Sequence, residues 1–535
     1  MSTGHRYFDC FASLGPRWGM EDGERHTLAH LIEDMDRCGI DAALVSATPA
    51  ATYDPLWANH WLLNQAAPWR KRLFPVWAAI PHHTGEFPKP EAFVRQARAA
   101  DVRAIRVYPK THCFSTDPAT MGPLMKSLAR ARLPLFVHRD QFDGSEPLGR
   151  FLDCYRGNRI VILGLGWSEF RFVVPLLERH KNWLMEFSTF QSNEAPEMLV
   201  RRFGAGRFLF GTDAPAKSPG AARAFFDWTG LASADARAIA SENLAGLLGL
   251  RAAPAAAKTP ADDIVAAQWA GRPLDHIEVL DAHIHVGHAG CQNIGPSTAL
   301  NSGPSEMKRL FRTMGVRRAA ASSFVGVTVP LPRLGNDLTY EAMRAEPDFF
   351  LGYACMDPVQ MSGSEMESEI KLRHGRQGFL GLKPYLKTSA AYDDPRYRPW
   401  YQYAARRRLF ALFHCSGPNA ARLADAAGRV AGAYRGMTAI LAHSGASFAV
   451  AKKNSQVALA NPNVFCEITY TSVANGAIEL LAENIGAKRV LFGTDAPMRD
   501  PRAQLGWVVH ARLSRQEKAD ILGANFARIL KKVRA

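Results

Sequence analysis

The stretch Val279-Leu280-Asp281-Ala282-His283-Ile284-His285-Val286-Gly287, near the middle of the chain, decides how the rest of the sequence is interpreted. It is short, largely apolar and ends at a glycine, which is typical of a buried strand. Because side chains alternate along a strand, His283 and His285 leave the same face and can bind one metal ion together. Two unrelated core histidines would give the same pattern, so the choice depends on the sequence further along the chain.

Length and composition predict a globular protein of more than one domain. The 535 residues exceed the roughly 250–300 at which a single core stops growing. The net charge is +15, but the basic residues are scattered, and no run exceeds the triplet Arg406-Arg407-Arg408. We therefore expect no nucleic-acid partner and attribute the charge to a solvated surface that attracts anionic substrates.

The cysteines and the apolar runs bear on the compartment. Eight cysteines without a Cys-x-x-Cys pair argue against a disulfide framework and against a thiolate zinc site. The N-terminal residues show no signal-peptide pattern, and no run of about 18 apolar residues occurs. We expect a cytoplasmic protein that does not interact with a membrane.

An internal repeat sets the domain organisation. The segment Leu209–Pro215 recurs identically as Leu491–Pro497, and Tyr7–Gly15 falls in register with Val279–Gly287. The repeat predicts a tandem duplication of one fold. An alanine- and proline-rich linker precedes a predicted helix at Ala261–Gly271, so we place the domains at residues 1–250 and 273–535, with 251–272 as linker and connecting helix.

Each half alternates short apolar runs with amphipathic segments such as Glu365–His374 and Pro399–Arg408. The runs predicted as strands in the second half are Val279–Val286, Ala319–Phe324, Phe349–Ala354, Phe379–Tyr385, Leu409–His414, Thr438–His443, Val464–Ile468 and Val490–Phe492. Eight strands alternating with helices over about 250 residues is the pattern of a (β/α)8 barrel. A doubly wound sheet would need a glycine-rich first turn, which does not follow Val286. We therefore predict an α/β protein of two tandem (β/α)8 TIM barrels.

Polar residues close several strands of the predicted second barrel. They are His283 and His285 on the first strand, Lys383 on the fourth, His414 on the fifth, His443 on the sixth and Asp495 after the eighth. Barrel enzymes carry their chemistry at the carboxyl ends of the strands, so these side chains should meet at one face. This convergence favours a metal site over isolated core histidines.

The pattern Asp-x-His-x-His, a histidine ending the fifth and the sixth strand, and Gly-Thr-Asp-x-Pro after the eighth resembles the amidohydrolase superfamily. It is most similar to the branch of metal-dependent hydrolases and non-oxidative decarboxylases such as aminocarboxymuconate semialdehyde decarboxylase. The resemblance covers nearly the whole second half. It implies that His283, His285, His414 and Asp495 bind one divalent metal and that His443 acts on the substrate.

The first half departs from that pattern. Phe11 and Ser13 occupy the positions of the two strand-one histidines, and Leu165 stands where His443 stands in the second half. Of the implied set only His138 and Asp213 remain, too few for the usual site. We predict a degenerate, non-catalytic barrel.

Two alternatives remain open in that barrel. A rebuilt site could use Asp9 or Cys10, although Cys10 should alternate away from the pocket. The carboxylate of Asp213 could persist for a structural reason, by accepting backbone N–H bonds in its turn. The first barrel could cover an apolar face of the second barrel or lend it Arg171, and a homo-oligomer is the alternative to such pairing within one chain.

The implied ligands predict the chemistry. Three imidazoles and a carboxylate leave a position for water, as in a catalytic site, and a bound cation lowers the pKa of that water from 15.7 toward about 7. Zinc suits the set best, with manganese or iron(II) as alternatives. Our hypothesis is that Asp495 binds the metal and moves the water's proton, while His443 polarises or protonates the group under attack.

Lys383 has two interpretations. Other branches of the superfamily carry a carboxylated lysine on strand four that bridges two metals. We expect Lys383 to bind a substrate carboxylate or to pair with a neighbouring acid instead.

Three functions follow from these predictions. The first is hydrolysis of an amide, lactone or related bond in a small, carboxylate-bearing molecule. The second is non-oxidative decarboxylation of an unsaturated or aromatic acid, and the third is a metal-binding or scaffold protein without turnover. The loops 287–304 and 322–336, which should shape the pocket, carry no recognisable signature.

Overall fold

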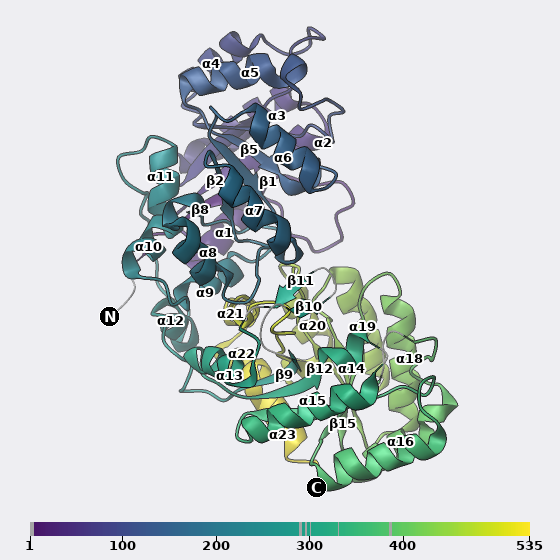
Figure 1. Ribbon diagram of the computed structural model, residues 1–535. Coiled ribbons are helices and arrows are strands. Elements are labelled where there is room, and N and C mark those ends of the chain that lie inside the picture. The colour runs from purple at the N-terminus through teal and green to yellow at the C-terminus, as the bar shows by residue number, and fades with distance from the viewer. Residues whose placement is uncertain are drawn as a thin grey trace. The chain divides into compact units, whose positions relative to one another are not determined.

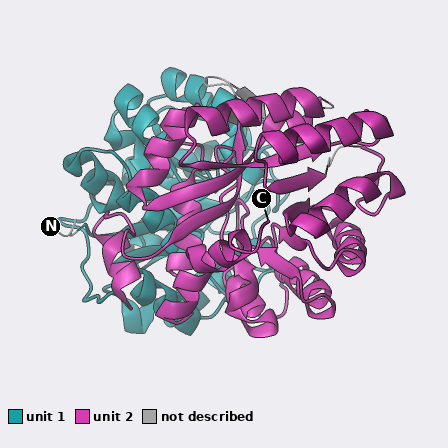
Figure 2. Cartoon of the chain, turned by 90° about the horizontal axis from the view of Figure 1, so that it is seen from below, with its two compact units in different colours: residues 1–20, 24–191, 195–261 teal, residues 21–23, 192–194, 262–535 magenta. Residues whose placement is uncertain are grey.

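The computed structural model describes residues 5–287, 292–294, 297–299, 301–329, 331–384 and 388–534. The chain divides into two compact units (Figure 2), one formed by residues 1–20, 24–191 and 195–261 and the other by residues 21–23, 192–194 and 262–535. The alanine- and proline-rich linker thus belongs to the first unit. The helix predicted after it is α12 (Asp263–Trp269), which belongs to the second unit.

The first unit is an eight-stranded parallel barrel in which each strand pairs with the next along the chain (Figure 1). Its strands are β1 (Phe8–Leu14), β2 (Ala42–Ala47), β3 (Leu73–Ala78), β4 (Ala104–Val107), β5 (Leu135–His138), β6 (Ile160–Leu163), β7 (Trp183–Glu186) and β8 (Phe208–Leu209). The segment after β8 hydrogen-bonds back to β1, since the amide of Cys10 donates to the carbonyl of Phe210 (2.9 Å). This contact brings the last strand next to the first.

The second unit repeats this architecture. Its barrel strands are β9 (Val279–Val286), β12 (Val316–Ser323), β13 (Phe350–Met356), β14 (Gly381–Pro384), β15 (Phe410–His414), β16 (Thr438–Ala442), β17 (Val464–Glu467) and β18 (Val490–Leu491). The strands β10 (Gln292–Ile294) and β11 (Ser297–Ala299) form a separate antiparallel pair. The predicted fold of two (β/α)8 barrels is confirmed, although Tyr385, at the end of one predicted strand, lies outside the described residues.

Helices alternate with the strands in both units. Those of the first unit are α1 (Leu28–Cys38), α2 (Pro49–Thr52), α3 (Pro55–Ala66), α4 (Pro90–Ala99), α5 (Pro118–Ala131), α6 (Ser145–Cys154), α7 (Phe170–Arg179), α8 (Ala195–Phe203), α9 (Pro219–Asp227), α10 (Ser233–Arg237) and α11 (Asn243–Leu247). Beyond α12, those of the second are α13 (Pro304–Thr313), α14 (Phe324–Thr328), α15 (Pro332–Ala345), α16 (Gly363–Glu369), α17 (Arg398–Arg407), α18 (Ala420–Ala433), α19 (Phe448–Ala460), α20 (Ala477–Ile485), α21 (Pro501–Val509), α22 (Arg515–Ala519) and α23 (Asn525–Leu530). The helix predicted at Glu365–His374 is α16 continued by a π-helical turn, Ile370–Arg376.

The interior of each barrel is filled by side chains from its strands. In the second unit the buried cluster includes Leu280 and Ala282 of β9, Leu412 of β15, Ile440 of β16 and Leu491 of β18. Phe526 of α23 closes the amino-terminal end of this cluster. The barrel interior is therefore a packed core, and in barrels of this kind the chemistry is carried at the carboxyl-terminal mouth.

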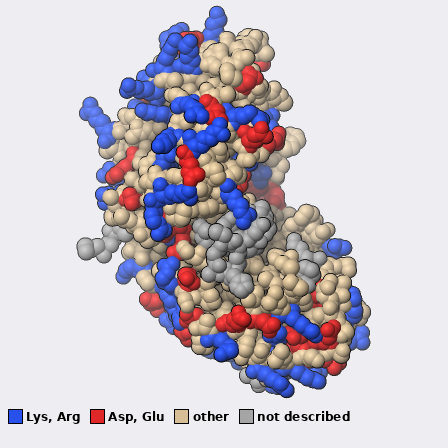
Figure 3. Space-filling view, in the orientation of Figure 1, with Lys and Arg blue, Asp and Glu red and all other residues tan. Residues whose placement is uncertain are grey.

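Two further observations concern the hydropathy of the helices and the charge of the surface. Among the residues that the structure describes, none of the helices combines the length and the hydropathy needed to cross a membrane. On the face drawn in Figure 3, Lys and Arg side chains are interspersed with acidic and uncharged ones.

Candidate metal centre

A β-bulge aims the two histidines of β9 into the barrel mouth. Asp281 and Ile284 pair with Ala319 and Ala321 of β12, so β9 contains one extra residue at this point. Leu280 and Ala282 face the core before the bulge, and His283 and His285 line the pocket after it. The predicted common face of the two histidines is thus correct, but the bulge is what turns that face toward the mouth.

Asp281 fixes the bulge to the loop after β18. Its Oδ1 accepts hydrogen bonds from the amides of His283 (2.9 Å) and Thr494 (3.2 Å), and its Oδ2 accepts one from the Thr494 hydroxyl (2.6 Å). Burial raises the pKa of Asp281 to about 8. The aspartate of the Asp-x-His-x-His motif is therefore a structural latch and lies behind the site.

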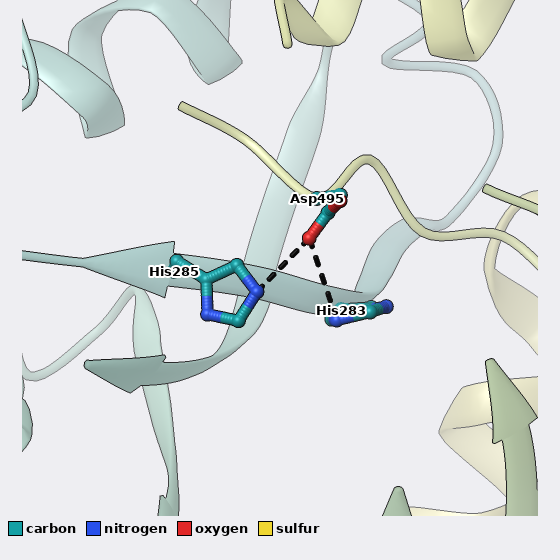
Figure 4. A group of neighbouring side chains, drawn as sticks. All are labelled: His283, His285 and Asp495. Carbon is teal, nitrogen blue, oxygen red and sulfur yellow. Dashed lines mark ion pairs between the residues drawn. The ribbon is translucent and has the colours of Figure 1, made fainter. Parts of the chain in front are cut away.

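Asp495 meets both histidines from the opposite side (Figure 4). Its Oδ1 lies 2.9 Å from Nε2 of His285 and 3.6 Å from Nε2 of His283. Asp495 is 4% exposed and has a positive φ of 57°, which turns its carboxylate toward β9. Its Oδ2 accepts a hydrogen bond from Arg499. Burial alone would raise the pKa of Asp495, but the Arg499 charge holds it well below its usual range.

The remaining ring nitrogens of the two histidines are bound to the protein. Nδ1 of His283 lies 3.1 Å from Oε2 of Glu467, and Nδ1 of His285 lies 3.2 Å from the Ser322 carbonyl oxygen. Metal-binding histidines commonly donate their second N–H to a carboxylate or a carbonyl in this way. Burial, with the charge of Lys383, lowers the pKa of His283 well below its usual value, so its ring is neutral. The ligand atoms of His283, His285 and Asp495 lie within 4.8 Å of one another, which fits a divalent cation.

Glycine in the Gly-Thr-Asp motif makes room for this arrangement. A Cβ on Gly493 would lie 2.6 Å from Oε1 of Glu467 and 2.9 Å from Cβ of His283. Any larger residue would push the carboxylate or the histidine out of place. The motif therefore contributes the space, the Thr494 latch and the Asp495 carboxylate.

His443 and His414 form a hydrogen-bonded chain in the same pocket. Nδ1 of His443 donates to the Thr469 carbonyl (2.9 Å), so its Nε2 accepts from Nδ1 of His414 (3.1 Å). Nε2 of His414 in turn accepts from the Ser416 hydroxyl (2.9 Å). Burial lowers the pKa of His443 to about 4, which keeps its ring neutral.

The metal-ligating role predicted for His414 stays a prediction. His414 lines the pocket with the other predicted residues. Two groups of closely spaced ligand atoms occur among the described residues, His283–His285–Asp495 and His283–His443–Glu467, and neither includes His414.

Lys383 and Arg499 place two cationic side chains at the pocket. Lys383 is 3% exposed, and its Nζ lies 3.3 Å from Nε2 of His283. Burial lowers its pKa. The pocket has a volume of about 310 Å³, and its apolar side chains are Phe324, Val327, Tyr470 and Met498. It can hold a small organic molecule between an apolar wall and a charged floor.

Sequence reasoning missed Glu467 and Arg499. Glu467 ends a buried strand at 0% exposure, and the first half has Glu186 at the corresponding strand end, a signal that the repeat contained. Arg499 follows Asp495 by four residues in a loop and has no counterpart motif, but Lys217 pairs with Asp213 at the same spacing (3.0 Å).

The corresponding mouth of the first barrel lacks the histidine pair. Phe11 corresponds to His283, since its carbonyl accepts from Asp213 N (2.8 Å) as the His283 carbonyl accepts from Asp495 N (2.7 Å). Ser13 corresponds to His285, since its amide donates to the Ala214 carbonyl (2.8 Å) as the amide of His285 donates to the Ala496 carbonyl (2.7 Å). Both groups of metal-capable side chains found in the described part of the chain lie in the second unit.

The position matching His443 is Gly164, one residue before the predicted Leu165. The amide of Gly164 donates to Glu186 (2.7 Å), as that of His443 donates to Glu467 (3.3 Å), and both residues have a positive φ, 68° and 65°. The prediction was wrong because the sequence alignment of β6 with β16 was shifted by one residue. A Cβ on Gly164 would lie 1.9 Å from Nε2 of His138, so the imidazole of His138 fills the space of the missing side chain.

The interpretation of Asp213 also needs correction. In the described structure its carboxylate pairs with Lys217 (3.0 Å), and no turn amide donates to it. The turn amides are satisfied by Asp9, which accepts from Thr212 N (3.1 Å), and by the Thr212 hydroxyl, which accepts from Ala214 N (3.1 Å). Cys10 packs in the barrel core and is not available as a ligand.

The fold and the site together define an amidohydrolase-like barrel, and the family comparison agrees. The amidohydrolase family model matches residues 29–250 and 280–532, and the chain belongs to this family. A search of curated proteins finds no match.

Solved structures similar to this chain each cover about half of it. They include 2,6-dihydroxybenzoate decarboxylase from Rhizobium (17% identity, TM-score 0.40, 48% of this chain and 99% of that one). A second is a putative amidohydrolase from Staphylococcus aureus (13% identity, TM-score 0.38, 48% of this chain and 100% of that one). A third is 4-oxalomesaconate hydratase from Rhodopseudomonas palustris (15% identity, TM-score 0.36, 48% of this chain and 96% of that one).

Proposed function

We propose that the second barrel is a metal-dependent hydrolase that acts on an amide, lactone or related bond of a small, carboxylate-bearing molecule. The convergence of His283, His285 and Asp495 at the closed end of a buried pocket carries this proposal. Two imidazoles and a carboxylate suit zinc best. His414, on the wall of the same pocket, completes the proposed set of four ligands.

A cation bound there would supply Lewis acidity and lower the pKa of a water molecule at neutral pH. The protein holds the proposed ligands ready for it, since Glu467 and Ser322 orient the two β9 histidines. His443 is neutral, its Nδ1 is bound to Thr469, and its Nε2 accepts from Nδ1 of His414, so Nε2 can take a proton from the substrate only when His414 turns from it toward the cation. We assign to it the proton transfer to or from the substrate.

The sequence predicted that Asp495 both binds the metal and moves the water's proton, and its contacts favour the first role. Arg499 holds its Oδ2, and its Oδ1 faces the histidines, so both oxygens have partners. A carboxylate whose pKa is held this low is a poor proton acceptor. We therefore propose that Asp495 acts as a ligand and that His443 is the general base.

Lys383 and Arg499 are proposed to recognise the substrate carboxylate. Both line the pocket, and both are cationic side chains beside its apolar wall. Arg499 presents a planar guanidinium suited to a carboxylate, whereas Lys383 provides a point charge. This use of Lys383 requires no carboxylation.

Decarboxylation of an unsaturated or aromatic acid is the second candidate. The side chains of Phe324, Val327 and Met498 line the same pocket as the two cations, and an aromatic acid would contact both kinds of side chain. The same residues would then bind the carboxylate that leaves. The loop 287–304, which was expected to shape the pocket, is only partly described, because residues 288–291, 295–296 and 300 lie outside the described residues.

For the first barrel we propose a degenerate copy that arose by tandem duplication and does not catalyse. It has phenylalanine, serine and glycine at three of the positions where the second barrel has histidine. Expressing residues 273–535 alone tests its contribution. A soluble fragment with full activity would show that the second barrel needs neither cover nor a borrowed side chain from the first.

Metal analysis followed by a substrate panel tests the proposed activity. We expect close to one divalent ion per chain, and turnover of a carboxylate-bearing lactone or amide without release of carbon dioxide. Release of carbon dioxide from an aromatic acid would select the second candidate. A purified protein that retains no metal from zinc-, manganese- or iron-containing buffer would refute both.

A further inference from the structure

A second cavity lies at the opposite end of the first barrel from its mouth. It has a volume of about 490 Å³ and is lined by the residues that precede β4 and β6 and by the ends of α5 and α11. Because all strands of the barrel are parallel, these amino-terminal ends share one face. In barrels of this kind this face normally contributes to stability and not to chemistry.

Four of the residues that line this cavity are arginines. They are Arg98, Arg103, Arg132 and Arg159, and the single acidic side chain among the lining residues is Asp101. Like charges that are held together in one hollow repel each other unless a counter-charge is supplied. One carboxylate cannot balance four guanidinium groups.

Two of the arginines are fixed by the fold. Arg98 donates to the carbonyl of Ala131 at the end of α5, and Arg103 donates to the carbonyl of Leu248 (3.2 Å) after α11. Arg103 also pairs with Asp101 (2.8 Å). Its Nε is buried and has no hydrogen-bond partner among the described residues. These contacts hold the guanidinium groups in place before any ligand arrives, which reduces the entropy lost on binding.

Arg132 and Arg159 supply charge without a partner. Neither side chain has a hydrogen bond or an ion pair with another described residue, and both are exposed. Arg132 has a φ of 53°, a conformation that favours glycine, yet the chain has an arginine there.

In the second barrel, the carbonyl that corresponds to that of Ala131 has a different hydrogen-bond donor. There α17 also ends at a residue with positive φ, Arg408 (54°), and the carbonyl of Arg407 accepts from the backbone amide of Arg534 (2.8 Å) in the C-terminal tail. In the first barrel the side chain of Arg98 performs this function, and the arginine-lined cavity lies beside it. The two units therefore differ in how this carbonyl is satisfied.

We propose that this cavity is a binding site for a small phosphorylated molecule. Guanidinium groups match the oxygens of a phosphate with paired, charge-assisted hydrogen bonds. A ligand with about three negative charges would balance the excess of arginine, and the volume suits a molecule of the size of a sugar phosphate or a nucleotide. The proposal does not depend on the reaction assigned to the second barrel.

Calorimetric titration of the full chain with inorganic pyrophosphate tests the site. The protein is first dialysed against a chelator, so that metal in the second barrel does not contribute, and the buffer contains about 0.15 M salt to screen non-specific attraction. We expect saturable binding at one site and a rise in melting temperature with ligand concentration. The double substitution Arg132→Gly and Arg159→Gln should weaken binding at least tenfold without loss of folding, because both side chains are exposed.

A matched control and a competing anion make the result decisive. Arg150→Gln removes an arginine of α6 that is 63% exposed and pairs with Glu146, and it should leave binding unchanged. Citrate, which carries a similar charge on carboxylates, should bind more weakly than pyrophosphate. The proposal is wrong if binding does not saturate, if the double substitution leaves the affinity unchanged, or if citrate binds equally well.

Discussion

Nδ1 of His283 lies 3.1 Å from Oε2 of Glu467, and both side chains are buried at 1% exposure or less. The carboxylate also accepts hydrogen bonds from the amides of His443 (3.3 Å) and Thr469 (2.6 Å). Glu467 therefore joins strand seven of the second barrel to the proposed ligand on strand one and to the proposed base on strand six. A residue outside the predicted set thus positions two residues within it.

Replacing Glu467 with glutamine should lower metal affinity about 10–100-fold, the usual effect of losing a ligand's hydrogen-bond partner. The amide retains the size of the side chain, but its –NH2 group cannot accept a hydrogen bond, so the bonds from His283 and Thr469 cannot both persist. Competition with a chromophoric chelator measures the change. Glu186→Gln is the matched control, because Glu186 makes the corresponding bond to Gly164 in the first barrel and should leave metal affinity unchanged. Equal losses in both variants would contradict the assignment.

Substitution of the two pocket histidines separates ligand from base. His443→Ala should retain the metal while turnover falls about 10²–10⁴-fold, the range expected for loss of a general acid or base. His414→Ala should instead lower the metal content, as measured by elemental analysis of the purified protein. Loss of metal from the His443 variant, together with its retention in the His414 variant, would exchange the two roles.

Removal of the Arg499 charge should weaken the dependence of unfolding free energy on acid pH. Arg499 holds the pKa of Asp495 below its unfolded value, so the pair contributes stability above the unfolded pKa, and this is lost as pH falls through the folded pKa. In Arg499→Met the folded pKa of Asp495 rises toward the unfolded value, so the variant should be less stable than the wild type at neutral pH and should lose less stability on acidification. Arg499→Lys, which keeps the charge, should shift the profile less. Denaturant unfolding of the metal-free protein across a pH series measures this, and superimposable profiles for Met and wild type would refute it.

The hydrogen bonds made by the aspartate at each bulge predict a loss of stability in both barrels and a loss of metal affinity in the second barrel alone. Asp281→Ala leaves three hydrogen-bond donors without an acceptor, at a cost of about 3 kcal/mol in unfolding free energy, and should also weaken metal binding because His283 is no longer fixed. Asp9→Ala removes the same bonds to Phe11 and Thr212. It should cost similar stability with no change in metal affinity. Unfolding curves and chelator competition on both variants test the difference.

Much of the fold and part of the site could be predicted from the sequence. The strands are short apolar runs bounded by glycine and polar residues, and the exact repeat of Leu209–Pro215 identified two halves of one architecture. The polar residues that end the strands meet in one pocket because parallel strands of a closed barrel share one mouth.

The unpredicted features depend on contacts that no local pattern encodes. A glutamate that ends a buried strand, such as Glu467, has the same local sequence pattern whether it supports a ligand or only the core. The bulge in β9 is invisible to simple alternation, although both histidines line the pocket as alternation predicted. The correspondence of Gly164 with His443 required the strand register and the backbone torsions, which the aligned leucines did not supply.

The bend that Asp281 imposes on β9 is also present in β1, where Asp9 makes it and phenylalanine and serine follow in place of histidine. The direction in which those two side chains point is therefore a property of the backbone and survives the loss of the imidazoles. Phe11→His and Ser13→His would be installed on a frame already shaped for them. The chain thus contains the same backbone frame twice, once with the histidine pair and once without it, and metal-binding measurements on the Phe11→His and Ser13→His variants would count the substitutions that the proposed centre requires.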